Sequence, residues 1–143
     1  MLLITARKRT PAPKQKKDVM PASKNRSLFI KYWLPVIIYA IIIFSISSIP
    51  GKAIPPIFKY QDVVFHFLEY AFLSVLLNRA LKAAVIPDAR IRRFCWVFIL
   101  CLLYALSDEL HQLFVPYRVA SLSDIATDGL GAFVAGIIYL WRR

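Results

Sequence analysis

Residues 94–118 read FCWVFILCLLYALSDELHQLFVPYR, and this stretch decides the fold of the chain. Residues 94–106 carry no charge, and Ser107, Asp108 and Glu109 follow them without an intervening glycine or proline. A helix from residue 94 to Ser107 would span about 21 Å, whereas the hydrocarbon core of a bilayer is about 30 Å thick. The helix is therefore predicted to continue through the acidic residues, which places two carboxylates within the depth of a membrane.

The composition of the whole chain also indicates a membrane protein. Of its 143 residues, 59% are hydrophobic, and the mean hydropathy is +0.57. This is too apolar for a soluble domain, and the length suits one small domain. Stretches of membrane-spanning character recur at residues 32–49, 63–77, 125–141 and from residue 94 into the quoted motif. We expect an all-α integral membrane protein, in which a basic tail (1–31) precedes a bundle of four transmembrane helices (32–143).

The positive charges predict the orientation of this bundle. Nine of the 19 Lys and Arg residues precede the first stretch, two fall in the first loop, five in the second, one in the third and two at the C-terminus. Cytoplasmic loops of membrane proteins carry the excess of Lys and Arg. Both termini and the second loop are therefore expected on the cytoplasmic side.

The N-terminal tail is basic and is rich in Lys, Pro, Ala and Ser. Such a composition is typical of disordered segments, and its charge favours contact with anionic lipid. The tail lacks the interleaved aromatic residues of nucleic-acid-binding arms. The expected partner is the lipid bilayer and not nucleic acid, and no cofactor is expected because glycine-rich phosphate loops are absent.

Most acidic residues and both histidines fall away from the basic ends of the four stretches. Measured from those ends, His66, Asp108 and Asp128 reach about the same depth, roughly 20 Å along three different helices. Intramembrane charges are costly unless they face protein, water or a partner. We predict an acidic chamber open to the outside, formed by Asp62, His66, Glu69, Asp108, Glu109, His111, Gln112, Arg118, Ser121, Asp124 and Asp128.

The spacing within each helix supports such a chamber. Residues three, four or seven apart share a helix face. This spacing relates Asp62, His66 and Glu69; Asp108, His111 and Gln112; and Asp124 and Asp128. The last helix also carries two small-xxx-small pairs, Gly131 with Ala135 and Ala132 with Gly136, which allow a close approach of two backbones.

A structural explanation of the charged residues is equally open. Buried charges usually need partners, so Asp108, Glu109, Asp124 and Arg118 can form an ion-pair network that ties the third and fourth helices together. The guanidinium of Arg118 could grip an external phosphate or carboxylate, but an internal partner, Asp124, is favoured.

A metal site and a serine nucleophile are not predicted. The two histidines among so many carboxylates make a divalent metal chemically possible. However, no cysteine or close histidine pair provides the spacing of a dedicated zinc motif. Ser121 and Ser123 are interpreted as a cap for the helix that starts near Asp124, because a serine nucleophile needs an adjacent base.

Taken together, these residues resemble the VanZ-like membrane proteins, a family named for a teicoplanin-resistance protein of bacteria. The similarity covers roughly residues 32–141. It rests on SSIP (47–50), on Asp62 with His66 and Tyr70, and above all on DELHQLFVPYRVASLSDIATDGLG (108–131). That segment looks like the family's Asp-Glu, Gln, Pro-x-Arg, Ser, Asp, Gly pattern. Val63 stands where a basic residue is expected, and Asp128 stands where the family usually has Asn.

The resemblance implies a multi-pass protein of the bacterial cytoplasmic membrane that is linked to the envelope or to a glycopeptide response. The preferred function is non-enzymatic binding of an envelope component or an amphiphilic, teicoplanin-like antibiotic in the chamber. One alternative is an intramembrane enzyme for a lipid-linked envelope substrate, with Asp108, Glu109 or His66 as acid or base. The other is a small proton- or cation-linked transporter, for which Glu69 lies nearest to mid-membrane.

Overall fold

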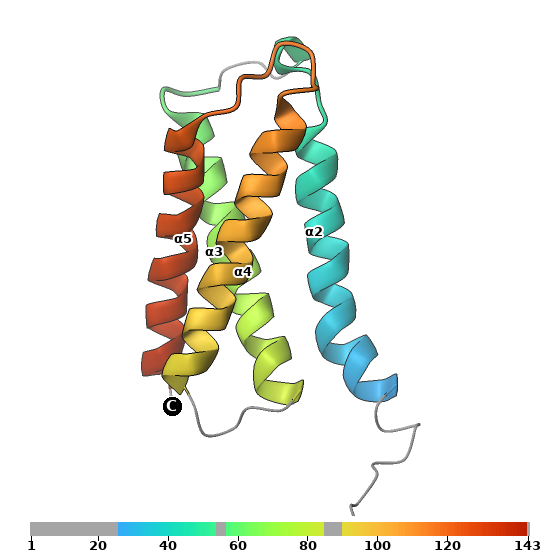
Figure 1. Cartoon of the computed structure of the whole chain (residues 1–143), viewed down its shortest axis with the longest axis vertical. Coiled ribbons are helices and arrows are strands. Elements are labelled where there is room, and N and C mark those ends of the chain that lie inside the picture. Colours follow the sequence, from blue (N-terminus) through green and yellow to red (C-terminus); the bar gives the residue numbers. More distant parts are fainter. Residues whose placement is uncertain (1–25, 54–56, 85–89, 143) are drawn as a thin grey trace, which may run out of the picture.

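The computed structural model describes residues 26–53, 57–84 and 90–142, and these residues form a bundle of long helices (Figure 1). The elements are the π-helical turn η1 (Phe29–Trp33), α2 (Leu34–Ser47), the 3-10 turn η2 (Gly51–Ala53), α3 (Gln61–Ala84), α4 (Arg90–Gln112) and α5 (Leu122–Trp141). Four helices are long and apolar enough to cross a membrane, namely Arg26–Ser47, α3, α4 and α5. The predicted all-α membrane bundle of four helices is confirmed.

The continuation of the third predicted helix through its acidic residues is also confirmed. α4 runs without a break from Arg90 to Gln112, so Asp108 and Glu109 lie in its last turns. Beyond Gln112 the backbone closes into tight turns, and Pro116, which has no N–H, cannot extend the helix. The apolar length and the proline together determine where α4 ends.

Within the described residues, the first helix starts with Arg26, inside the segment that was expected to be a tail. The backbone N–H of Leu34 bonds to the carbonyl of Phe29, five residues earlier, and Pro35 follows in the first turn of α2. A π-turn is a common way for a helix to accommodate a local irregularity, here next to a proline that lacks a donor. The remainder of the expected tail, residues 1–25, lies outside the described residues.

α3 and α5 pack against each other at very short range. A Cβ atom added at Gly131 would lie 2.2 Å from the carbonyl oxygen of Phe67, so only glycine fits at this crossing. Ser74 Oγ donates to the carbonyl of Ala132 at 2.9 Å across the same interface. The small residues of both predicted pairs are buried, which confirms their role in close backbone packing.

α2 stands at the edge of the bundle (Figure 1) and buries few of its side chains, namely Val36, Ile43 and Ser47. Its outer face exposes Ile37, Ile41 and other large apolar residues, and the other three helices do the same. A soluble monomer rarely exposes such continuous apolar surface. These faces are therefore suited to lipid tails.

The two ends of the bundle differ. Arg26, the last turn of α3, the first turn of α4 and the last turn of α5 lie at one end, while η2 and the α4–α5 connection lie at the other (Figure 1). We refer to the second as the loop end. There the backbone N–H of Gly51 donates to the carbonyl of Pro116 at 3.2 Å, which joins the two loops. The cytoplasmic location of the opposite end remains a prediction from the charge distribution.

Candidate functional site

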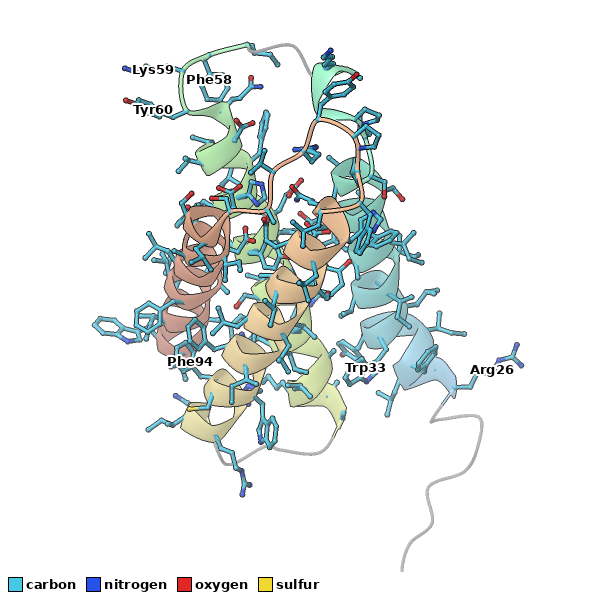
Figure 2. All side chains as sticks on the ribbon, turned by 45° about the horizontal axis from the view of Figure 1, so that its top comes forward. Arg26, Trp33, Phe58, Lys59, Tyr60 and Phe94 are labelled. Carbon is cyan, nitrogen blue, oxygen red and sulfur yellow. The ribbon has the colours of Figure 1, made fainter. Side chains whose placement is uncertain are left out.

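A cavity of about 250 Å³ lies between α2, α3 and α4 toward the loop end. Figure 2 shows side-chain oxygen and nitrogen atoms gathered between the helices in this part of the bundle. Its apolar lining residues are Ile43, Ile46, Ile49 and Phe65. Its polar lining residues are Ser47, Asp62, His66, Glu69, Asp108, Gln112 and Arg118.

A second pocket, of about 310 Å³, adjoins this cavity at the loop end. The two share Asp62, Gln112 and Arg118 in their linings. The second pocket is completed by Gly51, Gln61, Tyr117, Val119 and Asp124. We call the first space the inner cavity and the second the outer pocket. Seven of the predicted chamber residues line one or both of them.

The helical spacing in α3 accounts for three of these residues. Asp62, His66 and Glu69 lie on successive turns of one helix face, and all three line the inner cavity. From α4, Asp108 and Gln112 line the same space, and Gln112 Nε2 donates to Asp108 Oδ2 at 3.3 Å. The predicted polar face of α3 and two of the three residues predicted on the α4 face, Asp108 and Gln112, therefore turn toward a common space.

A further group of polar residues lies behind the cavity wall. A hydrogen bond joins His66 Nδ1 and Asp128 Oδ1, 3.0 Å apart, and it becomes an ion pair when the imidazole is protonated. Glu109 Oε2 accepts a hydrogen bond from the backbone N–H of Ser121 at 2.7 Å. Glu109 and Asp128 do not belong to the linings of the inner cavity and outer pocket. The predicted chamber thus divides into residues that face open space and residues that are packed between α3, α4 and α5.

Several of these buried polar atoms have no hydrogen-bond partner among the described residues. They are Ser47 Oγ, Tyr70 OH, Asp108 Oδ1, Glu109 Oε1 and Asp128 Oδ2. Most buried polar atoms in proteins are hydrogen-bonded, and an unsatisfied one costs about 1–3 kcal/mol. A purely structural network would be expected to satisfy its own members. Buried oxygens without a partner are what a site for a ligand, ion or water requires, and Glu109 and Asp128 lie together beside His66.

Arg118 does not pair with Asp124, contrary to the expectation from sequence. Its Nε donates to the carbonyl of Ile49 at 3.1 Å and its Nη2 to that of Ile46 at 3.4 Å. These carbonyls lie at the C-terminal end of α2, where the helix dipole attracts a cation. Among the described residues, Arg118 forms no ion pair with an acid of α4 or α5.

His111 and Ser121 are placed outside the two cavity linings. His111 Nε2 lies 3.0 Å from Ser48 Oγ, and the imidazole stacks on Phe44 with ring centroids 4.2 Å apart. Three residues after Asp108 on a helix, His111 is rotated toward α2. The side chain of Ser121 accepts from the backbone N–H of Ser123 at 3.2 Å and caps α5 at its start, Leu122, which confirms the capping interpretation.

The sequence reasoning missed the apolar lining of the inner cavity and four residues of the outer pocket, namely Gly51, Gln61, Tyr117 and Val119. Isoleucines in a lipid-facing helix carry no signal that distinguishes a cavity wall from a lipid contact. Tyr117 of the outer pocket has φ 61°, an uncommon backbone conformation for a non-glycine residue, and Lys52 Nζ lies 3.9 Å from the centre of its ring. The sequence signal that could have identified Tyr117 is its position within the Pro-x-Arg segment, between Pro116 and Arg118.

The four apolar helices define a multi-pass α-helical membrane protein, and its polar residues surround a cavity between three of those helices. A family model described as VanZ/LLP1 matches residues 19–143, so the chain belongs to the VanZ/LLP1 family. The resemblance inferred from the motifs is confirmed. Family and helices together fit a membrane protein linked to the cell envelope and antibiotic resistance. No curated protein and no solved structure matches the chain.

Proposed function

We propose that the protein binds a cationic amphiphile in the inner cavity, either an envelope component or a teicoplanin-like glycopeptide, and does not alter it chemically. The observation that carries this proposal is the mixed lining of the cavity. Ile43, Ile46 and Ile49, from α2 and the segment after it, offer apolar surface, while Asp62 of α3 and Asp108 of α4 offer carboxylates. An amphiphile with an amine next to a hydrocarbon chain complements both kinds of surface.

The charge balance favours a cationic ligand group over an anionic one. Three carboxylates, Asp62, Glu69 and Asp108, line the inner cavity, against the single guanidinium of Arg118. That guanidinium is already engaged by the carbonyls at the end of α2. An ammonium group would supply donors to carboxylate oxygens that are otherwise poorly compensated.

The size of the space limits what enters it. Pockets for drug-sized ligands hold about 300–1,000 Å³. The inner cavity of about 250 Å³ is smaller than this range, and the outer pocket adds about 310 Å³. The two spaces therefore suit one amine-bearing head group or amino sugar with the start of its chain, while the rest of a larger ligand stays in the membrane or outside it.

Binding to the purified protein in lipid nanodiscs tests this proposal. A fluorescent teicoplanin-type lipoglycopeptide is titrated against the unaltered chain, against Glu69→Gln and against Glu69→Asp. Loss of one charge-assisted contact is expected to weaken binding about tenfold in Glu69→Gln, whereas Glu69→Asp retains most of the affinity. Equal affinity of all three proteins, or unchanged affinity for the same ligand with its amines acetylated, would contradict the proposal.

A second candidate function is acid–base catalysis on a lipid-linked envelope substrate. The observation that favours it is the bond between His66 and Asp128, since a carboxylate that orients an imidazole is a recurring arrangement for a general base. Profiles of lipid-linked precursors are compared in cells that express the unaltered chain or His66→Gln at equal protein levels. A product that forms only with the unaltered chain would favour the enzyme over the binding protein.

A further inference from the structure

His66, Glu109 and Asp128 bring one imidazole and two carboxylates together from three different helices, α3, α4 and α5. One ring nitrogen of His66 and one oxygen from each carboxylate all lie within 4.8 Å of one another. We propose that this triad binds one divalent transition-metal ion, with zinc as the best match. Of these three residues only His66 lines the inner cavity, and the proposal does not depend on what the cavity binds.

The burial of the triad separates it from an ordinary acidic surface cluster. Glu109 is 2% exposed and Asp128 is 1% exposed, so their carboxylates are shielded from bulk water. Each carboxylate uses one oxygen in a hydrogen bond, to the Ser121 N–H and to His66 respectively. The other oxygen of each, Glu109 Oε1 and Asp128 Oδ2, has no partner among the described residues.

A deficit of positive charge around these buried acids also supports a bound cation. Asp108, also buried, has an unpartnered Oδ1, and the only ion-pair partner of these three acids among the described residues is His66. A buried carboxylate that lacks a compensating charge is strongly destabilising. A bound dication would compensate the charge and occupy lone pairs that the protein leaves unused.

The donor set selects the class of metal. Imidazole nitrogen suits zinc and its neighbours, whereas calcium and magnesium prefer sites made of oxygen alone. Zinc binds nitrogen and carboxylate oxygen at about 2.0–2.2 Å, so its ligand atoms stand about 3.4 Å apart in a tetrahedral site. His66 Nδ1 and Asp128 Oδ1 are already 3.0 Å apart. The three ligand atoms lie within 4.8 Å of one another, so the other pairs have to approach by at most about 1.4 Å to reach the tetrahedral spacing.

Three protein ligands leave one position of a tetrahedral ion to water or another small ligand. His66 also lines the inner cavity, so the triad shares one residue with that space. The placement of the ligands also explains why the sequence contains no recognisable zinc motif. The ligands come from separate helices, and no pair of them has the short sequence spacing of a zinc motif.

Metal uptake by the full-length protein in detergent tests the proposal. The chain is stripped with a chelator, equilibrated with Zn²⁺ in the presence of excess Mg²⁺, and analysed for zinc per chain by mass spectrometry. We expect one zinc per folded chain and binding that is more than about tenfold weaker in Glu109→Gln, because a direct ligand should matter at least as much as an outer-shell partner. Absence of zinc from the unaltered chain would overturn the proposal.

Asp124→Asn is the matched control, since Asp124 lies one turn before Asp128 on α5 and lines the outer pocket. This variant should keep its zinc, and an equal loss in both variants would show non-specific attraction to acids. X-ray absorption at the zinc edge of the unaltered chain serves if Glu109→Gln does not fold. The expected shell holds one imidazole with oxygen ligands, and a shell without imidazole would overturn the proposal.

Discussion

α3 meets α5 backbone to backbone, whereas α2 is attached to the rest of the bundle by a few buried apolar side chains and single polar contacts. At the α3–α5 interface, Gly131 leaves no room for a Cβ atom against the carbonyl of Phe67. At α2, the hydroxyl of Tyr104 donates to the carbonyl of Ala40 at 2.6 Å, and Arg118 holds the carbonyls at the helix end. The first interface depends on the close fit of two backbones, and the second on a small number of side-chain contacts.

The inner cavity lies between these two kinds of attachment. Its apolar isoleucines belong to α2 and the segment that follows it, while its acids belong to α3 and α4. A change at the α3–α5 interface should therefore affect the whole bundle. A change in the contacts of α2 should alter the cavity more than the stability of the fold, because α2 buries few side chains.

The largest effect is expected from Gly131→Ala. The added methyl group would lie 2.2 Å from the carbonyl oxygen of Phe67, and a backbone atom cannot move aside as a side chain does. Overpacking of this kind costs about 1–3 kcal/mol or more. Thermal melting in detergent should show a clear decrease in midpoint or a loss of folded protein.

Gly129→Ala is the control for that substitution. Its methyl group would meet only the side-chain Cδ2 of Leu102 at 3.0 Å, which can rotate away. We expect a much smaller change in melting. Equal melting of Gly131→Ala and the unaltered chain would show that α3 and α5 can separate at little cost, and the contrast with α2 would disappear.

An intermediate effect is expected from Arg118→Gln. This change removes the cation and weakens the bonds to the carbonyls of Ile46 and Ile49. Because the side chain is partly exposed, we expect a loss of about 1–2 kcal/mol. Hydrogen exchange should increase at the end of α2 and stay unchanged in α3. Arg118→Lys keeps the charge near the helix end, so its hydrogen exchange should lie between that of the unaltered chain and that of Arg118→Gln. Equal exchange in all three proteins would show that Arg118 does not hold the end of α2.

The smallest effects are expected from a matched pair, Tyr104→Phe and Ser74→Ala. Each removes one hydroxyl that donates to a backbone carbonyl, of Ala40 in α2 or of Ala132 in α5. A hydrogen bond contributes about 1 kcal/mol net. Ser74→Ala should lower the melting midpoint of the bundle slightly, whereas Tyr104→Phe should mainly increase hydrogen exchange in α2. The reverse result would contradict the comparison, because it would make α2 the better anchored helix.

A feature of the site can be predicted from the sequence when it is set within one helix, and not when it depends on contacts between separate elements. The faces of α3 and α5 follow from local periodicity, so the shared face of Asp62, His66 and Glu69 was available from the sequence. The partner of Arg118 was not, because Asp124 and the carbonyls of α2 are equally plausible acceptors for a guanidinium until the loop end is folded. In the folded protein, Arg118 donates to the carbonyls of Ile49 and Ile46.

By itself, the sequence determined the four apolar helices, the continuation of α4 through Asp108 and Glu109, and the small residues of α5 that admit a close neighbour. These features depend on length, hydropathy and helical repeat, which act within one segment. Only the tertiary structure decided that His111 turns to α2 while Glu109 and Asp128 meet His66. The rotation of each helix about its axis is set by packing against the others, and a rotation of one residue moves a side chain from the cavity to a neighbouring helix.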